Sequence, residues 1–192
     1  MSKQIWKPGA LLAPVPPALV TCGTVESPNV LTVGWTGIVS THPAMTYVSI
    51  RPERHSYPLI KEGGSFVINL PTRKLARAVD FCGVRSGRDV DKFATCHLTA
   101  AEAATVSAPI LAECPVNLEC RVSQIIELGS HHMFLAEITA VRVDDAILDE
   151  NGRLCLDKAD LMAYAHGEYF ALGEKLGTFG WSVKKKKKPK KK

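Results

Sequence analysis

The chain has 192 residues, which is enough for one domain with a continuous hydrophobic core. Hydrophobic residues make up 46% and charged residues 22%, an ordinary balance for a soluble globular protein. The formal net charge of +5 comes from the eight lysines at 184–192, and subtracting their charges leaves −3. The body is therefore mildly acidic, and its charge does not indicate a nucleic-acid partner.

The N-terminus predicts no targeting or membrane segment. The first residues, MSKQIWKPG, lack an apolar signal core. No apolar stretch approaches the roughly 18 residues needed to cross a bilayer. A cytoplasmic protein with no membrane partner is therefore expected.

Most of the chain is predicted to form β-strands, because apolar β-branched residues alternate with polar ones. The clearest strand starts at Val116, with Val116 and Cys120 on an apolar face and Glu119 and Arg121 on a polar face. The expected strands are Ala18–Val25, Val30–Ser40, Thr46–Arg51, Ser65–Leu70, Val116–Leu128 and Met133–Val143. Short turns such as Gly129-Ser130 favour a closed barrel over an open sheet with exposed edges.

Helices are predicted to be few and short. Ser56–Glu62 should form one, with Ser56 as its N-cap and Gly63-Gly64 after its end. Arg73–Phe81 should form a second that ends near Gly83, and a third is expected near Asp157–Tyr164. No Gly-x-Gly-x-x-Gly follows a strand, and no Gly-x-x-x-x-Gly-Lys-Ser/Thr is present. A bound nucleotide would therefore be held by a site other than these two glycine-rich motifs.

The six cysteines do not indicate a metal site. None has Cys-x-x-Cys spacing, and no histidine lies at zinc-ligand spacing from a cysteine pair. Reduced, structural thiols and no metal are expected at Cys22, Cys82, Cys96, Cys114, Cys120 and Cys155.

The terminal lysines predict a disordered tail at 184–192 after a single domain at 1–183, because like charges repel one another. Two interpretations stay open: a weak clamp for RNA, DNA or an anionic membrane surface, and a solubilising extension. No aromatic residue lies among the lysines to stack on bases, which favours the second interpretation.

The segment Asn29–Pro43 has the composition of a surface for a flat ring. Leu31, Val33, Trp35 and Val39 would form its apolar face. The even positions include small residues that mostly carry hydroxyls: Thr32, Gly34, Thr36 and Ser40. A flat ring can approach the backbone only where side chains are small, and its polar edge needs hydroxyls and backbone groups. A barrel strand with glycines at a bulge is the alternative.

The segment Arg51–Pro58 suggests a phosphate site. Arg54 directly precedes the predicted helix start at Ser56. Free amide groups, the positive end of a helix dipole and a guanidinium together bind phosphate. A capped surface helix with a solvated arginine fits this segment equally well. Together, the Asn29–Pro43 segment, suited to a flat ring, and the Arg51–Pro58 segment, suited to a phosphate, favour binding of a mononucleotide.

Seven short motifs occur in a family-specific order along the chain. They are Asn29-x-x-Thr-x-Gly-Trp35, Ser40-x-x-Pro43, Arg54-His-Ser-Tyr57, Asn69-Leu-Pro71, Ser86-Gly-Arg-Asp-Val-Asp-Lys-Phe93, Gly129-Ser-His131 and Phe179-Gly-Trp-Ser182. With them the chain resembles the flavin reductase-like family, in particular its flavoredoxin branch. The resemblance implies a mainly β fold, the FMN-binding split β-barrel of Greek-key type with a few short peripheral helices.

The resemblance also implies where a flavin would bind. The segment from Asn29 to Ser40 would border the ring and ribityl chain, and the segment starting at Arg54 would hold the phosphate. The loop from Ser86 would close over the cofactor and supply Lys92 as a second phosphate cation. The expected cofactor-binding residues are Asn29, Thr32, Trp35, Thr36, Ser40, Arg54, His55, Ser56, Tyr57 and Lys92.

One catalytic candidate follows from the resemblance. His131 matches a histidine that lies near the nicotinamide or flavin in several flavin reductases. The family often has an acid before this histidine, whereas this chain has Ser130. His131 and His132 should point to opposite faces of a strand, so at most one faces the site. Cys82 is either a neighbour of the cofactor or a buried inert thiol.

The favoured function is an NAD(P)H-dependent flavin or ferric reductase, with FMN as cofactor, NADH or NADPH as co-substrate and hydride arriving at flavin N5. The alternative is a flavoredoxin-type electron carrier that holds FMN tightly and serves protein redox partners. A third hypothesis is a basic-tailed nucleic-acid or surface-binding module that has lost its flavin, against which Thr32, Arg54 and Ser56 argue. The resemblance further implies a homodimer.

Overall fold

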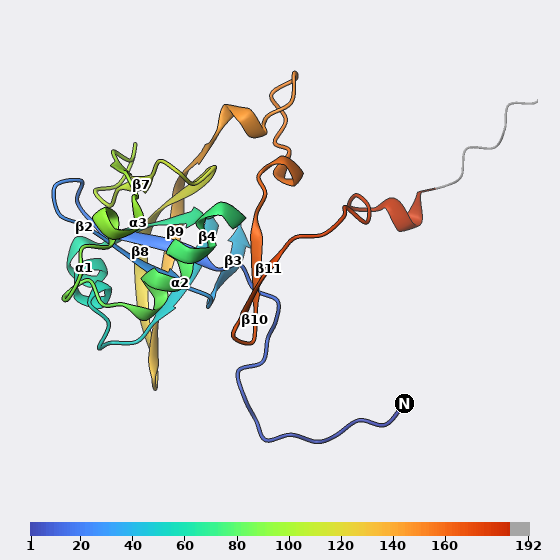
Figure 1. Cartoon of the computed structure of the whole chain (residues 1–192), viewed down its shortest axis with the longest axis horizontal. Coiled ribbons are helices and arrows are strands. Elements are labelled where there is room, and N and C mark those ends of the chain that lie inside the picture. The colour runs from blue at the N-terminus through green and yellow to red at the C-terminus, as the bar shows by residue number, and fades with distance from the viewer. Residues whose placement is uncertain (185–192) are drawn as a thin grey trace, which may run out of the picture.

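The computed structural model describes residues 1–184, which are mainly β-structure (Figure 1). A seven-stranded antiparallel sheet has the order β2-β1-β5-β8-β9-β4-β3. Its strands are β1 (Ala18–Gly23), β2 (Pro28–Val33), β3 (Thr36–Thr41), β4 (Ala44–Ile50), β5 (Ser65–Leu70), β8 (Val116–Leu128) and β9 (His131–Val143). Two small sheets pair β6 (Ala100–Ala101) with β7 (Ile110–Leu111) and β10 (Met162–Ala165) with β11 (Glu168–Ala171). The helices are α1 (Ser56–Gly63), α2 (Ala76–Val84) and α3 (Lys92–Cys96), with 3-10 turns at Arg73–Leu75, Asp145–Ile147, Leu156–Lys158 and Trp181–Val183.

The large sheet curls because its two edge strands are consecutive in the chain. β2 and β3 lie at opposite ends of the strand order, yet only Gly34 and Trp35 connect them. The Ser49 N–H of β4 also donates to the Trp35 carbonyl at 2.9 Å. So short a link holds the two edges close together, and the sheet forms a barrel that stays split between β2 and β3.

The turn at Gly34 and Trp35 shows that the single strand predicted over Val30–Ser40 is wrong. The alternation stops at Gly34, where the chain leaves the β1 ladder and joins the β4 ladder. Leu31 and Val33 are buried as expected, but Trp35 and Val39 are exposed. The four residues therefore do not form one apolar face.

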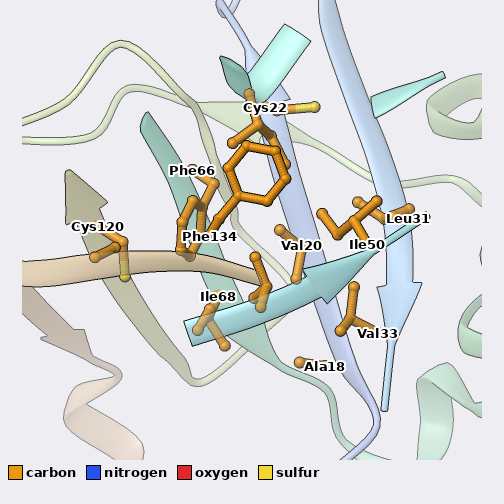
Figure 2. Packing of buried hydrophobic residues seen from close by; sticks show 13 residues of the cluster. Ala18, Val20, Cys22, Leu31, Val33, Ile50, Phe66, Ile68, Cys120 and Phe134 are labelled. Atoms are coloured by element: carbon orange, nitrogen blue, oxygen red, sulfur yellow. The ribbon is translucent and has the colours of Figure 1, made fainter. Parts of the chain in front are cut away.

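The interior of the barrel holds the main hydrophobic core (Figure 2). Phe66 of β5 and Phe134 of β9 are fully buried at its centre, and Val20, Ile50 and Ile68 pack around them. The strands predicted at these positions are confirmed, because their alternating apolar residues face this core.

The outer face of β5 and β8 is covered too, which the alternation in β8 did not indicate. Segment 99–111 crosses this face and buries Asn117 and Glu119. The Asn117 amide donates to the Asn69 side chain at 2.8 Å and to the Leu111 carbonyl at 3.1 Å. Arg121, two residues beyond Glu119, is exposed as predicted.

The expected helix near Asp157–Tyr164 is wrong. A 3-10 turn ends at Lys158, and Asp160 has a φ of 50°, which interrupts helical geometry. The chain then forms the β10–β11 hairpin, where Tyr164 pairs with Tyr169. Cross-strand pairing of these tyrosines, with ring centroids 5.3 Å apart, replaces the helix.

The ends of the chain extend away from the barrel (Figure 1). Trp6 and Leu12 near the N-terminus and Leu176 and Phe179 near the C-terminus are exposed. Within residues 1–184 no helix has the length and apolarity of a membrane span. Of the predicted lysine tail, residues 185–192 lie outside the described part of the chain.

Candidate functional site

Arginines gather where β4 passes into α1. The Arg54 N–H bonds to the Arg51 carbonyl at 3.0 Å, which makes a tight turn before the helix. The Arg51 guanidinium lies 3.1 Å from the Glu53 carboxylate. Arg54 is exposed and makes no ion pair among residues 1–184. The turn therefore presents a guanidinium that is available to a ligand.

Ser56 does not cap α1, which corrects the predicted N-cap. The helix begins at Ser56 itself, and His55 occupies the capping position without a side-chain hydrogen bond. The Ser56 side chain is instead buried, and its Oγ accepts a 2.6 Å hydrogen bond from the Asn29 amide. This contact fastens β2 to the start of α1, so that both predicted segments border one hollow.

We call this space, of about 460 Å³, the cationic hollow. Five basic and two acidic side chains line it, so positive charge dominates. These residues are Arg51, Arg54, Arg85, Arg88, Lys92, Glu53 and Asp89. A hollow of this charge favours an anion that accepts several hydrogen bonds, such as a phosphate.

Lys92 is the buried member of this set. Its side chain belongs to the first residue of α3 and is 5% exposed. Its Nζ donates to the Val30 carbonyl at 2.7 Å and to the Cys82 carbonyl at 2.9 Å. An ammonium has three donors, so two are used by carbonyls and one is available to the hollow. Burial lowers the pKa of Lys92, because the charged form loses hydration.

Cys82, whose carbonyl holds Lys92, is a structural thiol. Burial raises its pKa to about 12, so the thiol is protonated and unreactive at pH 7. All six cysteines are free. Among residues 1–184 no group of three His, Cys, Asp or Glu side chains is placed to hold a metal ion.

Gly87 allows the loop between α2 and α3 to close over β2. A Cβ at this position would lie 2.2 Å from the Asn29 Oδ1 and 2.9 Å from the His55 ring. A side chain at residue 87 would therefore displace the Asn29 and His55 side chains or the loop itself. The glycine is thus needed for close approach of backbone to the site.

A second space, of about 410 Å³, lies beside the first, and we call it the aromatic hollow. Its walls include Trp35 of the β2–β3 turn, His131 of β9 and Tyr164 and Tyr169 of the β10–β11 hairpin. The two hollows share the lining residues Leu31, Thr32, Arg51, Arg54 and Gly83. Together they form one groove with an aromatic end and a cationic end.

His131 lies at the aromatic end. Its ring is 4.2 Å from the Trp35 ring, and its Nδ1 is 3.0 Å from the Ser130 hydroxyl. Partial burial and the nearby Arg51 hold the pKa of His131 below its usual range, so the imidazole is neutral at pH 7. His132 points the other way and contacts the Tyr57 hydroxyl at 2.7 Å. Of these two neighbours, His131 lines the aromatic hollow and His132 does not.

The structure brings most of the predicted site residues to this groove. Those that line it are Thr32, Trp35, Arg54, His55, Ser56, Lys92 and His131. Asn29 lines a neighbouring space, together with His55, Gly87 and Lys92. The Thr32 hydroxyl is engaged by the Val79 carbonyl of α2. Thr36, Ser40 and Tyr57 line neither hollow in the described structure. The Thr36 hydroxyl bonds the Tyr47 carbonyl at 2.6 Å instead.

Sequence reasoning missed several residues that line the groove. Arg85 directly precedes the loop from Ser86, and Arg88 lies within it. Their positive charge was a sequence signal for an anion site. Tyr164 and Tyr169 carried no usable signal, because the segment around Tyr164 was predicted to be helical.

Three comparisons with known proteins agree with this geometry. A family model described as the flavin reductase like domain matches residues 11–173. The flavoredoxin of Desulfovibrio vulgaris (Miyazaki F) is 33% identical and superposes with a TM-score of 0.88, covering 95% of this chain and 100% of that one. A flavoredoxin from Methanosarcina acetivorans is 26% identical, with a TM-score of 0.85 over 95% of this chain and 100% of that one.

A curated but uncharacterised protein of Archaeoglobus fulgidus is 39% identical over 138 residues, which is 72% of this chain and 77% of that protein. The structural matches confirm the predicted fold class, a mainly β split barrel with short helices.

Proposed function

Because this chain belongs to the flavin reductase-like domain family, we propose that it binds FMN and acts as an NAD(P)H-dependent flavin or ferric reductase. Family membership supports a flavin-binding redox protein in general. The continuity of the aromatic and cationic hollows carries the finer proposal. FMN has a flat ring at one end and a phosphate at the other, and this groove has a complementary surface for each.

The cationic hollow fits the phosphate of FMN. Arg54 presents an exposed guanidinium, and Lys92 supplies a buried ammonium with one available donor. The phosphate would accept hydrogen bonds from both side chains. The low dielectric around Lys92 would strengthen the bond from its ammonium. We assign the phosphate-binding role to these two residues, with His55 and Ser56 beside them.

The aromatic hollow fits the isoalloxazine ring. Trp35 and His131 form one wall, while Thr32 and Gly83 line both hollows where they join. A Cβ on Gly83 would lie 3.3 Å from the Thr32 Cβ, so any larger residue would crowd this passage. These residues would orient the ring and exclude water from one side of it.

When bound, FMN supplies the redox chemistry, since its ring accepts a hydride at N5 and passes electrons on. The protein contributes position and electrostatics. His131, neutral at pH 7, can donate or accept one hydrogen bond at the ring edge without adding charge. We therefore propose it as a residue that contacts nicotinamide or flavin.

The close similarity to two flavoredoxins favours a second candidate, an electron carrier that holds FMN tightly and serves protein redox partners. Both candidates use the same groove. We also propose a homodimer, because the extended ends expose Trp6, Leu12, Leu176 and Phe179.

An absorbance spectrum of the purified protein tests the proposal. A flavin band is expected, and it should bleach rapidly under anaerobic conditions after addition of NADH or NADPH. A band that survives both nucleotides but bleaches with dithionite would favour the carrier. A colourless protein that also fails to bind added FMN would disprove the assignment of the groove.

The phosphate assignment predicts the effect of Arg54→Ala. Loss of a charge-assisted contact at an exposed position should weaken FMN binding by about tenfold. Fluorescence titration of apoprotein with FMN would measure it, with Arg121→Ala as control, because Arg121 is exposed on β8 outside the groove. An affinity within about threefold of the unmodified protein would show that Arg54 does not bind phosphate.

A further inference from the structure

Helix α2 has two apolar faces, of which the barrel uses one. Ala78, Val79 and Cys82 are buried against the barrel. Phe81 and Val84 lie on another face, where Val84 is 70% exposed and Phe81 is half-buried. Exposed apolar side chains next to a binding groove often mark a contact surface for a ligand.

This outer face of α2 forms a hollow of about 710 Å³, which we call the α2 shelf. The β10–β11 hairpin provides its other wall. Its lining residues are Ala76, Arg77, Asp80, Phe81, Val84, Arg85, Gly167 and Tyr169. Asp80, Val84, Gly167 and Tyr169 also line the aromatic hollow. The shelf therefore opens directly onto the ring end of the groove.

The charge of the shelf favours an anion. Arg77 and Arg85 are exposed, and neither forms an ion pair within residues 1–184. The one acid, Asp80, faces the Tyr169 hydroxyl at 3.4 Å. Two unpaired guanidiniums beside an apolar surface suit a ligand that carries both phosphates and a flat ring.

We propose that the α2 shelf binds the adenosine diphosphate part of the nicotinamide dinucleotide. Arg77 and Arg85 contact its phosphates, and Phe81 and Val84 support its adenine. The nicotinamide then reaches the aromatic hollow across the residues that both spaces share. This inference rests on the proposed reductase function. Arg85 also lines the cationic hollow, so the two anion sites share this residue, whereas Arg77 belongs to the shelf alone.

The shelf suits a small ligand better than a protein partner. It is hollowed, and its walls continue those of the groove where the ring would lie. An acidic protein or a second copy of this chain would need a larger matching surface.

Calorimetric titration of FMN-loaded protein tests the inference with adenosine diphosphate ribose, which has the phosphates and adenine but no nicotinamide. Arg77→Gln is expected to weaken its binding by about fivefold or more, and that of NAD⁺ and NADP⁺ equally. Binding of nicotinamide mononucleotide should change less than twofold. Arg77 lines only the shelf, so FMN affinity should stay unchanged.

Lys74→Gln is the matched control, because Lys74 is exposed in the turn before α2 and lines neither the shelf nor the groove. Unchanged adenosine diphosphate ribose affinity in Arg77→Gln would overturn the inference. So would a wild-type protein that retains FMN but binds none of the adenine nucleotides, while the FMN assignment would survive. Dissociation of a dimer in Arg77→Gln without loss of nucleotide affinity would overturn it too, and would assign the shelf to a second copy.

Discussion

Lys92→Met is expected to weaken FMN binding by roughly 10- to 100-fold. Lys92 is the buried cation of the cationic hollow, and its Nζ is held by the carbonyls of Val30 and Cys82. Water screens a buried charge weakly, so its contact with phosphate is stronger than one at the surface. Methionine keeps the length and apolar stem of lysine but removes the charge and all three donors. Fluorescence titration of the apoprotein with FMN measures the loss.

The same assignment predicts a pH dependence. Burial lowers the pKa of Lys92 in the free protein, whereas bound phosphate favours the charged form. FMN affinity should therefore decrease as rising pH deprotonates Lys92, before the ordinary lysine value of 10.5 is reached. Lys92→Met should remove this decrease.

Lys61→Met provides the control, because Lys61 is exposed at the last turn of α1. It should leave both the affinity and its pH dependence unchanged. If Lys92→Met binds FMN as well as the unmodified protein does, Lys92 only fastens β2 to α2, and the second phosphate cation must be sought elsewhere.

Glu119→Gln is expected to reduce the free energy of unfolding by about 3–5 kcal/mol. The Glu119 side chain is fully buried on the outer face of β8. Its carboxylate accepts hydrogen bonds from the N–H groups of Ala104 and Thr105 and from the Thr105 hydroxyl, and it pairs with Arg142 at 3.1 Å. An amide places an N–H₂ group where these donors need an acceptor. Chemical denaturation followed by circular dichroism would measure the change.

The loss should be confined to stability and should depend on pH. Burial opposes ionisation of Glu119, but hydrogen bonds from Ala104 and Thr105 and the charge of Arg142 hold its pKa below the ordinary value of 4.5. Its contribution is therefore complete above pH 4.5 and is lost as pH falls through the lowered pKa, so the difference between the two proteins should shrink in acid.

Glu127→Gln is the matched control on the same strand, because Glu127 is exposed and should change stability by less than about 0.5 kcal/mol. FMN affinity should stay unchanged in both variants, since neither residue lines the groove. Equal stability of the two variants at neutral pH would show that the Glu119 contacts do not hold segment 99–111.

Most of the strands, and the family, could be predicted from the amino-acid sequence alone. Alternation of apolar and polar residues is a local property, and it predicted the strands around Phe66 and Phe134 because those residues face a core. The order of seven motifs identified the family. It also drew attention to Arg54, Lys92 and His131, which the structure places along one groove.

What covers each face of the sheet, and which distant segments meet, depends on the folded chain and could not be predicted from the sequence. Alternation assigned Glu119 and Arg121 to the same face of β8, yet segment 99–111 buries the first and leaves the second in solvent. The residues from Val30 to Ser40 alternate as one strand, but pairing of their two halves with β1 and β4 divides them at Gly34. The burial of Lys92 likewise depends on carbonyls of β2 and α2. A strand pattern records which side chains share a face, whereas burial depends on packing between segments far apart in the chain.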